Sequence, residues 1–169
     1  MILELLVGPI ASGKSTYCRK AANDGAIILN DDAIVTAIHG GDYRLYNKSL
    51  KPLYKSVENT IVCTALSMGE RWQELLGTAD VQRIFRIVID RPNHSIKMRR
   101  RFIALAHSFD CNVKIVMFKR EVPEVHGERR FISDSRGHTL DYWIDVARYH
   151  QSLYQPPDQA IEQFDEIVE

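Results

Sequence analysis

The sequence has few cysteines, no excess of either charge and no long apolar run. Its three cysteines, Cys18, Cys63 and Cys111, follow no metal-ligand spacing, so the sequence predicts reduced thiols in a cytoplasmic protein. Lys plus Arg and Asp plus Glu each number 22, which argues against a strongly basic coat but permits a local basic groove. No apolar run approaches the ~18 residues that span a membrane, so we expect no membrane partner.

The order of the predicted elements is that of an α/β domain. A length of 169 residues suits one core, so we expect a single domain over residues 1–169. The apolar N-terminus lacks the basic lead-in of a signal peptide and is predicted to be a strand. Strands that alternate with helices imply a parallel sheet of about five strands with helices on both faces. The predicted strands are residues 2–7, 26–29, 85–89, 113–118 and 164–168, and the predicted helices are residues 14–22, 33 onward, 53–66, 96–109, part of 121–136 and 140–153.

Apolar spacing predicts which face of two of these helices is buried. Each set of apolar residues recurs every three or four positions, which is the period of one helix face. In the helix at residues 53–66 the inward positions are predicted to be Leu53, Val57, Ile61, Ala65 and Leu66. In the helix at residues 140–153 they are predicted to be Leu140, Ile144, Ala147 and Leu153.

The segment GPIASGKS, residues 8–15, matches the phosphate-binding pattern G-x-x-x-x-G-K-[ST] in full. Glycines let the backbone turn tightly, so that successive N–H groups point at one phosphate, and the helix that follows favours negative charge at its start. We expect Lys14 to reach the β- and γ-phosphates and the Ser15 hydroxyl to bind Mg²⁺. The residues predicted to bind the nucleotide in this loop are Gly8, Ala11, Ser12, Gly13, Lys14, Ser15 and Thr16.

A phosphate loop is shared by motors, GTPases and kinases of several kinds. GTPases need a guanine reader of the form N-K-x-D, whereas Asn47 and Lys48 are followed by Ser and Leu. The chain is also shorter than an AAA+ motor with its lid domain. These two observations leave the small kinases, with ATP as the default phosphate donor.

Carboxylates follow two of the predicted strands directly. Asp31 and Asp32 come after the second strand, where a carboxylate can accept the proton of an acceptor hydroxyl. The alternative is a helix N-cap, with Asp32 or Asn30 capping the helix from residue 33. Asp90 ends the run FRIVID and is predicted to hold Mg²⁺ or contact the acceptor, with loop capping as the alternative.

Two arginine-rich segments are candidates for contact with phosphates. The segment HGERRFISDSRGH carries Arg129, Arg130 and Arg136 between the fourth strand and the last long helix, the place of an arginine-bearing lid at about residues 121–139. The run KMRRRF, residues 97–102, is predicted to form a solvated helix face, and contact with a phosphate backbone is the sharper alternative.

The sequence resembles the 5′-hydroxyl polynucleotide kinases among the small P-loop kinases. Four segments carry the resemblance in the family's order: GPIASGKST, LNDD, VIDRPN and the long segment from RRFISDSRG to YQPPDQAIEQFDEI. The resemblance implies that Asp31 is the general base for the 5′-hydroxyl and that Lys14 and Ser15 hold ATP and Mg²⁺. It also implies that Arg130 and Arg136 contact the donor phosphates from the lid and that Asp90 supports the site.

The sequence departs from the phage members of that family around the aspartate pair. Those members carry an arginine before the pair and another shortly after it, where this chain has Asn30 and Ile34. Arg44 or the basic run at residues 97–101 is the predicted replacement for the second arginine, which clamps the acceptor phosphate. No D-x-D-x-T phosphatase motif is present, so kinase activity alone is expected.

Three functions follow from these observations. The first is an ATP- and Mg²⁺-dependent kinase of 5′-hydroxyl ends of DNA or RNA in nucleic-acid repair, acting in the cytoplasm, or in the host cytoplasm for a phage protein. The second is a kinase of a small hydroxylated metabolite or antibiotic, which the neutral net charge and the missing arginine favour. The third is a nucleotide-dependent switch, for which an Asp31→Ala change would leave every activity intact.

Overall fold

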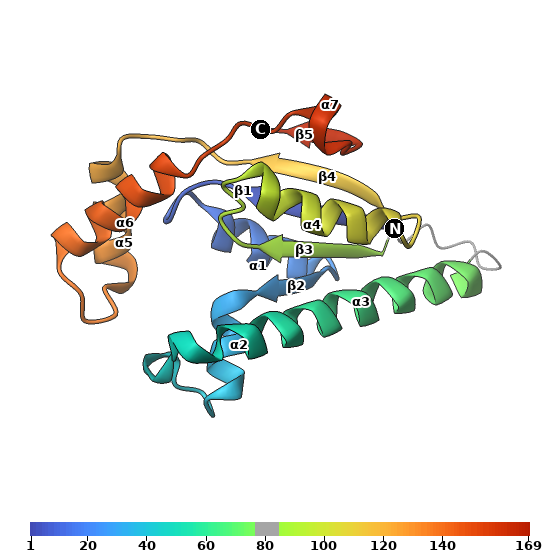
Figure 1. Cartoon of the computed structure of the whole chain (residues 1–169), viewed down its shortest axis with the longest axis horizontal. Helices are drawn as coiled ribbons and strands as arrows, with labels where there is room; N and C mark the ends of the chain where they lie inside the picture. Colours follow the sequence, from blue (N-terminus) through green and yellow to red (C-terminus); the bar gives the residue numbers. More distant parts are fainter. Residues whose placement is uncertain (77–84) are drawn as a thin grey trace.

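The computed structural model describes residues 1–76 and 85–169, in which five parallel strands form one sheet. The order across the sheet is β2-β3-β1-β4-β5, so β1 lies at the centre (Figure 1). In register, Leu5 of β1 lies beside Ile89 of β3 and Ile115 of β4. The carboxyl ends of β1, β2 and β3 therefore finish side by side. The strands are β1 (Ile2–Val7), β2 (Ile27–Asn30), β3 (Arg86–Asp90), β4 (Asn112–Met117) and β5 (Glu166–Val168).

Helices cover both faces of the sheet, as the sequence predicts. On one face Cys18 of α1 packs against Leu6, and on the other Leu66 of α3 and Phe102 of α4 pack around Leu5. The helices α5 and α6 pack against each other beyond the carboxyl ends of the strands (Figure 1). The helices are α1 (Lys14–Asn23), α2 (Asp31–Ile38), α3 (Lys51–Leu76), α4 (Ile96–His107), α5 (Pro123–Asp134), α6 (Leu140–Ser152) and α7 (Gln159–Glu162), with single turns η1 (Tyr43–Leu45) and η2 (Lys48–Leu50).

The α/β fold and its five-stranded parallel sheet are confirmed, and most predicted ends agree within one or two residues. Ser95 caps α4, as expected, because its side chain accepts a hydrogen bond from the Met98 backbone N–H at 3.3 Å. Cys18 and Cys111 are buried free thiols, and Cys63 is a half-buried one. Within residues 1–76 and 85–169, none of the helices combines the length and apolar character that a membrane span requires.

The predicted buried face of α3 is confirmed at Ala65 and Leu66 but is wrong nearer the start of the helix, where Leu53 and Ile61 are exposed. Tyr54, Glu58 and Val62 are buried there instead. The reason is Glu58, whose carboxylate is buried against Arg91 and Arg101. A prediction that places only apolar residues inside assigns the face with Glu58 to the outside. The helix also runs ten residues beyond the predicted end at residue 66. In α6, Ala147 is buried as expected and Trp143 is buried beside it.

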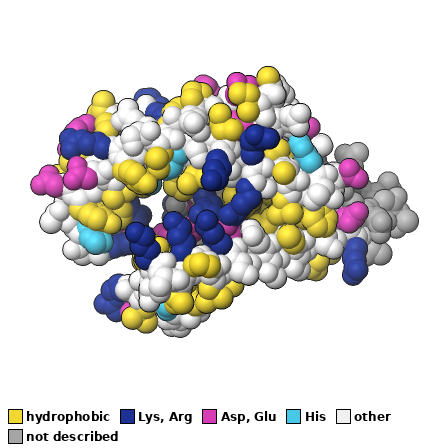
Figure 2. Space-filling view, in the orientation of Figure 1, with side chains coloured by type: hydrophobic (Ala, Val, Ile, Leu, Met, Phe, Trp, Pro, Cys, Tyr) yellow, Lys and Arg dark blue, Asp and Glu magenta, His cyan; other side chains and the backbone are white. Residues whose placement is uncertain are grey.

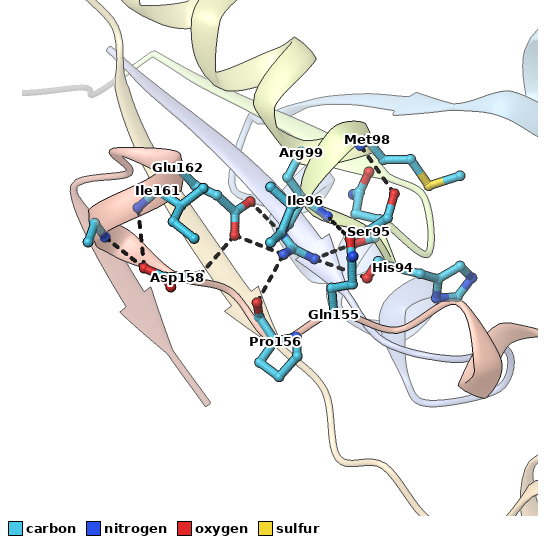
Figure 3. Close-up of polar contacts among 12 residues, drawn as sticks. His94, Ser95, Ile96, Met98, Arg99, Gln155, Pro156, Asp158, Ile161 and Glu162 are labelled. Carbon is cyan, nitrogen blue, oxygen red and sulfur yellow. Dashed lines mark hydrogen bonds and ion pairs between the residues drawn. The ribbon is translucent and has the colours of Figure 1, made fainter.

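The prediction of a solvated face for the run at residues 97–102 is wrong for the first of its three arginines, Arg99. Arg99 is fully buried and forms two hydrogen bonds to the Glu162 carboxylate, at 2.7 and 2.8 Å (Figure 3). Its guanidinium also donates to the backbone oxygens of Asn93 at 3.0 Å, His94 at 3.2 Å and Pro156 at 3.3 Å. Its partner Glu162 lies 63 residues further along the chain, so no local pattern reveals the pair.

The Arg99–Glu162 pair is predicted to be essential to stability. Glu162→Ala would leave a buried guanidinium without its counter-charge, which we expect to lower the free energy of unfolding by about 3–5 kcal/mol. Replacing both partners with apolar residues, as in Arg99→Met with Glu162→Leu, is expected to cost less than the single change. Urea denaturation followed by circular dichroism measures both, and a double variant less stable than Glu162→Ala would contradict the assignment.

Candidate active site

The phosphate loop joins the end of β1 to the start of α1. Gly13 has a φ of +104°, a left-handed conformation that glycine adopts without strain, and it is the residue from which α1 begins. At Gly8, a Cβ atom would lie 2.7 Å from the Phe118 Cβ and 2.9 Å from the Ser12 Oγ. The loop therefore requires glycine at two of the positions that the sequence pattern specifies.

Lys14 is buried at the base of this loop. Its Nζ donates to the Gly8 carbonyl oxygen at 2.9 Å and to the Pro9 carbonyl oxygen. Burial lowers the pKa of Lys14 to about 8, an effect that the nearby Asp90 carboxylate opposes. The ammonium is buried, lies at the start of a helix, and donates its strong hydrogen bonds to neutral carbonyl oxygens. It therefore has no counter-charge among its close partners, which fits a site for the phosphate chain of a nucleotide.

A cleft of about 370 Å³ opens above the carboxyl ends of β1, β2 and β3. Figure 2 shows a hollow on one face of the molecule with Lys and Arg side chains gathered around it. The cleft brings together every residue predicted to be catalytic, from three separate parts of the chain, and Asp90 from a fourth. Its lining includes Ala11, Lys14, Ser15, Asp31, Asp32, Asp90, Arg130 and Arg136.

Asp31 lies in the cleft beside an arginine that the sequence analysis did not single out. The Arg91 guanidinium forms ion pairs with the Asp31 carboxylate and, at 2.8 Å, with Glu58 of α3. Burial raises the pKa of Asp31 to about 7; Arg91 opposes this shift, and the Glu58 and Asp32 carboxylates add to it. Burial alone would raise the pKa of Glu58. Three contacts together lower it: the charge of Arg91, the hydrogen bond with Asp31, and the hydrogen bond and charge of Arg101.

The N-cap of α2 is Asn30, one of the two caps that the sequence allowed. The Asn30 side-chain oxygen accepts from the Ala33 backbone N–H at 2.9 Å, and its amide nitrogen donates to Asp90 at 2.8 Å. The helix consequently begins at Asp31, and Asn30 rather than Asp32 is its cap. Neither aspartate caps the helix, and both line the cleft.

The arginines of α5 and the turn after it line the cleft from the side opposite the sheet. Arg136 donates to the Asp32 carboxylate at 2.8 Å, and its guanidinium lies 4.4 Å from the centre of the Tyr43 ring. The Arg130 guanidinium lies 4.9 Å from the centre of the Trp143 ring. The contact of Arg136 with Asp32 joins two segments that are 104 residues apart in the sequence.

Other predicted residues lie outside this cleft. The Arg44 side chain is 87% exposed and pairs with Asp42 at 2.9 Å, away from the cavities that the described residues form around Asp31. Gly8, Ser12, Gly13 and Thr16 belong to the loop and the first turn of α1 but do not line the cleft. Arg129 pairs with Glu121 on the surface. The sequence feature that could have identified Arg91 as a site residue is its position directly after the end of the third predicted strand.

A second cavity, of about 250 Å³, lies on the other side of Asp31 between α2 and α3. The two cavities share Asp31, Asp32, Tyr43 and Arg91, so the aspartates stand at their junction. The remaining lining includes a tyrosine stack and two lysines of α3. Ring centres are 6.1 Å apart for Tyr43 and Tyr46 and 5.6 Å for Tyr46 and Tyr54, and the lysines are Lys51 and Lys55.

Comparisons with known proteins agree with this fold. A family model described as an AAA domain matches residues 3–129, from β1 to the middle of α5. The crystal structure of Chaetomium thermophilum Kti12 in complex with ADP-AlF3 is similar, with a TM-score of 0.52 and 11% identity, over 98% of this chain and 88% of that one. At that identity the likeness shows the fold alone. No curated protein matches the sequence. That the protein is not an AAA+ motor, which we infer from the length of the chain, stays a prediction.

The burial of Lys14 predicts a specific effect on nucleotide binding. Lys14→Met is expected to weaken ATP binding by about tenfold or more, because the one buried ammonium of the loop is lost, a change of at least ~1.4 kcal/mol. Lys20→Met is the matched control, since Lys20 lies on the same helix and is exposed. Isothermal titration calorimetry with ATP and Mg²⁺ measures both, and equal affinities for the two variants would contradict the assignment.

Proposed function

The chain belongs to the AAA domain family of P-loop nucleotide-binding proteins, and we propose that it is an ATP-dependent kinase of 5′-hydroxyl ends of DNA or RNA. The observation that carries the proposal is the position of Asp31 between two cavities. One cavity holds Lys14 and the arginines suited to a donor, and the other suits an acceptor. A carboxylate at that junction meets the requirement of a general base, which must reach the hydroxyl that attacks the phosphate.

On the donor side, the side chains of the cleft supply positive charge to the phosphates of ATP. Lys14 contacts them from the loop, and Arg130 and Arg136 contact them from the proposed lid at residues 121–139. The residues that would hold Mg²⁺ are Ser15 and Asp90, and the ion would neutralise charge on the β- and γ-phosphates. For Arg136 this role requires an exchange of its present partner, Asp32, for a phosphate oxygen.

On the acceptor side, Asp31 orients the 5′-hydroxyl and accepts its proton. The hydroxyl oxygen forms a bond to the γ-phosphorus, the bond from that phosphorus to the β,γ-bridging oxygen breaks, and ADP leaves with the electron pair. A pKa of about 7 places Asp31 close to the operating pH, where a general base is most effective. Its ion pair with Arg91 keeps the carboxylate in one orientation.

Arg91 is the proposed replacement for the acceptor clamp that the sequence lacks. Ile34, at the position of the missing arginine, is buried and apolar, whereas Arg91 reaches the second cavity from the end of β3. The stacked tyrosines offer a flat surface for a base, and Lys51 and Lys55 offer charge for a phosphate. These features support an acceptor that carries both a base and a phosphate.

A kinase of a small hydroxylated metabolite or antibiotic is the second candidate. It is favoured by the volume of the second cavity, about 250 Å³, which suits one small molecule. The zero formal net charge of the chain also favours it over long nucleic acids. Both candidates use the same donor cleft and the same aspartate, so the acceptor alone separates them.

The deciding experiment is transfer of labelled phosphate from ATP to 5′-hydroxyl oligonucleotides of DNA and RNA in the presence of Mg²⁺. We expect label on the oligonucleotides, and no label on oligonucleotides that already carry a 5′-phosphate. A parallel series with small hydroxylated metabolites and antibiotics follows ADP release. Transfer to a member of that series and to neither oligonucleotide would replace the first candidate by the second.

The role of Asp31 is tested in the same assay. Asp31→Asn is expected to lower turnover by about 10²- to 10⁴-fold, because the amide cannot accept the proton, while ATP binding is unchanged. Asp42→Asn is the matched control, since Asp42 pairs with Arg44 outside both cavities. Full turnover by Asp31→Asn would show that another group is the base.

The charges around Asp31 predict opposite shifts in the pH profile. The ionised carboxylate is the active form, so kcat/KM is expected to rise with pH through an acid limb near the Asp31 pKa of about 7. Glu58→Gln removes a group that raises this pKa, so the limb moves to lower pH. Arg91→Gln removes a group that lowers it, so the limb moves to higher pH. Shifts in the same direction, or none, would contradict the assignment.

A further inference from the structure

The outer face of α3 carries large apolar side chains along most of its length. Leu53 is 45% exposed, Ile61 37%, Met68 60% and Trp72 49%, and the half-buried Val57 lies between the first two. At 3.6 residues per turn these positions fall within an arc of about 100° on one side of the helix. In Figure 1, α3 runs along the lower edge of the molecule. Monomers expose single apolar residues, whereas a continuous stripe over five turns marks a covered surface.

The same face has no exposed charge over its central turns. Between Ser56 and Gly69 the sequence contains one charged residue, Glu58, and its carboxylate is buried against Arg91 and Arg101. A helix that faces water normally carries Lys and Glu on its outer side. The absence of charge therefore agrees with a face that is buried in an assembly.

The spacing of the stripe is symmetric on reversal. When the exposed Thr64, which lies within the same arc, is counted with the apolar residues, the positions follow one another in steps of four, four, three, four and four residues. The pattern then reads the same from either end. If two copies of α3 lie antiparallel, Leu53 of one faces Trp72 of the other, Val57 faces Met68 and Ile61 faces Thr64. These positions are 53, 57, 61, 64, 68 and 72.

The charges at the two ends of α3 favour the antiparallel arrangement over the parallel one. Lys51 and Lys55 are exposed in the first turns, and Glu70 and Arg71, whose charges balance, are exposed near the other end. An antiparallel pair brings the lysine end of each helix to this balanced end of its partner, and it places the two helix dipoles in opposite directions. A parallel pair would place the four lysines together.

We propose that the protein forms a two-fold symmetric dimer in which α3 packs antiparallel against α3 of a second copy. A two-fold contact uses the same patch on both copies, which is what a stripe symmetric on reversal supplies. A contact about 30 Å long between helices about 10 Å wide buries on the order of 1,000 Å² in total, at the lower end for stable interfaces. The dimer is therefore expected to dissociate on dilution.

Sedimentation equilibrium of the full chain tests the dimer. The expected mass rises with concentration from 19.4 kDa toward twice that value. Ile61→Glu and Met68→Glu are each expected to raise the dissociation constant at least tenfold, because each buries two charges at the two-fold contact. Ile161→Glu, at a 50% exposed site on α7, is the matched control and is expected to have no effect. Circular dichroism checks that each variant is folded.

A constant mass of 19.4 kDa up to the highest soluble concentration would overturn the proposal, as would a dimer that neither α3 variant weakens. A monomer that binds lipid vesicles or another protein through these residues would overturn it as well.

Disulfide trapping tests the direction of the two helices. In a Cys63→Ser background, where Cys18 and Cys111 are buried, Ile61→Cys and Thr64→Cys protein are mixed and oxidised. The antiparallel arrangement predicts faster cross-linking between the two variants than within either one. Faster cross-linking of Ile61→Cys with itself than with Thr64→Cys indicates parallel helices and would overturn the proposal.

Discussion

The two ion pairs of Arg91 organise the acceptor side of the cleft. One joins the guanidinium to Asp31 at the start of α2, and the other joins it to Glu58 in the first third of α3. A single cation thus connects the end of β3 to both helices that enclose the second cavity. It also limits how far burial and the neighbouring carboxylates raise the Asp31 pKa. Arg91 therefore contributes both to the orientation and to the proton affinity of the proposed base.

The position of Arg91 depends in turn on the segment that follows β3. The Asn93 amide donates to the Leu6 carbonyl oxygen at 2.9 Å, just before the phosphate loop. The Arg99 guanidinium holds the backbone oxygens of Asn93 and His94 and is itself held by Glu162. A buried ion pair far from the cleft thereby links the C-terminal segment to the phosphate loop and to the acceptor side. The hydrogen bonds of the Arg99 guanidinium to these oxygens and to Glu162 offset part of the desolvation cost of the buried pair.

Local patterns were sufficient to predict the sheet, the phosphate loop and the position of Asp31. Each depends on a short run of residues: an apolar strand, a glycine-rich turn, or a carboxylate at the end of a strand. Glu58 and Arg99 were beyond such reasoning because they are charged residues on inward faces. Their burial is tolerated only through partners 33 or more residues away, Arg91 and Glu162 respectively. The same effect made the predicted inner face of α3 wrong at Leu53 and Ile61, whereas Ala65 and Leu66 are buried as predicted.

The proposed mechanism requires Asp31 to have the proton affinity of a base that works near neutral pH. The most direct measurement is an NMR titration of the Asp31 side-chain carboxyl carbon in the intact protein, assigned by comparison with Asp31→Asn. The account predicts a midpoint at about pH 7. A midpoint near the ordinary value of 3.8 would mean that burial and the Glu58 carboxylate do not act on Asp31 as described, and it would contradict the account.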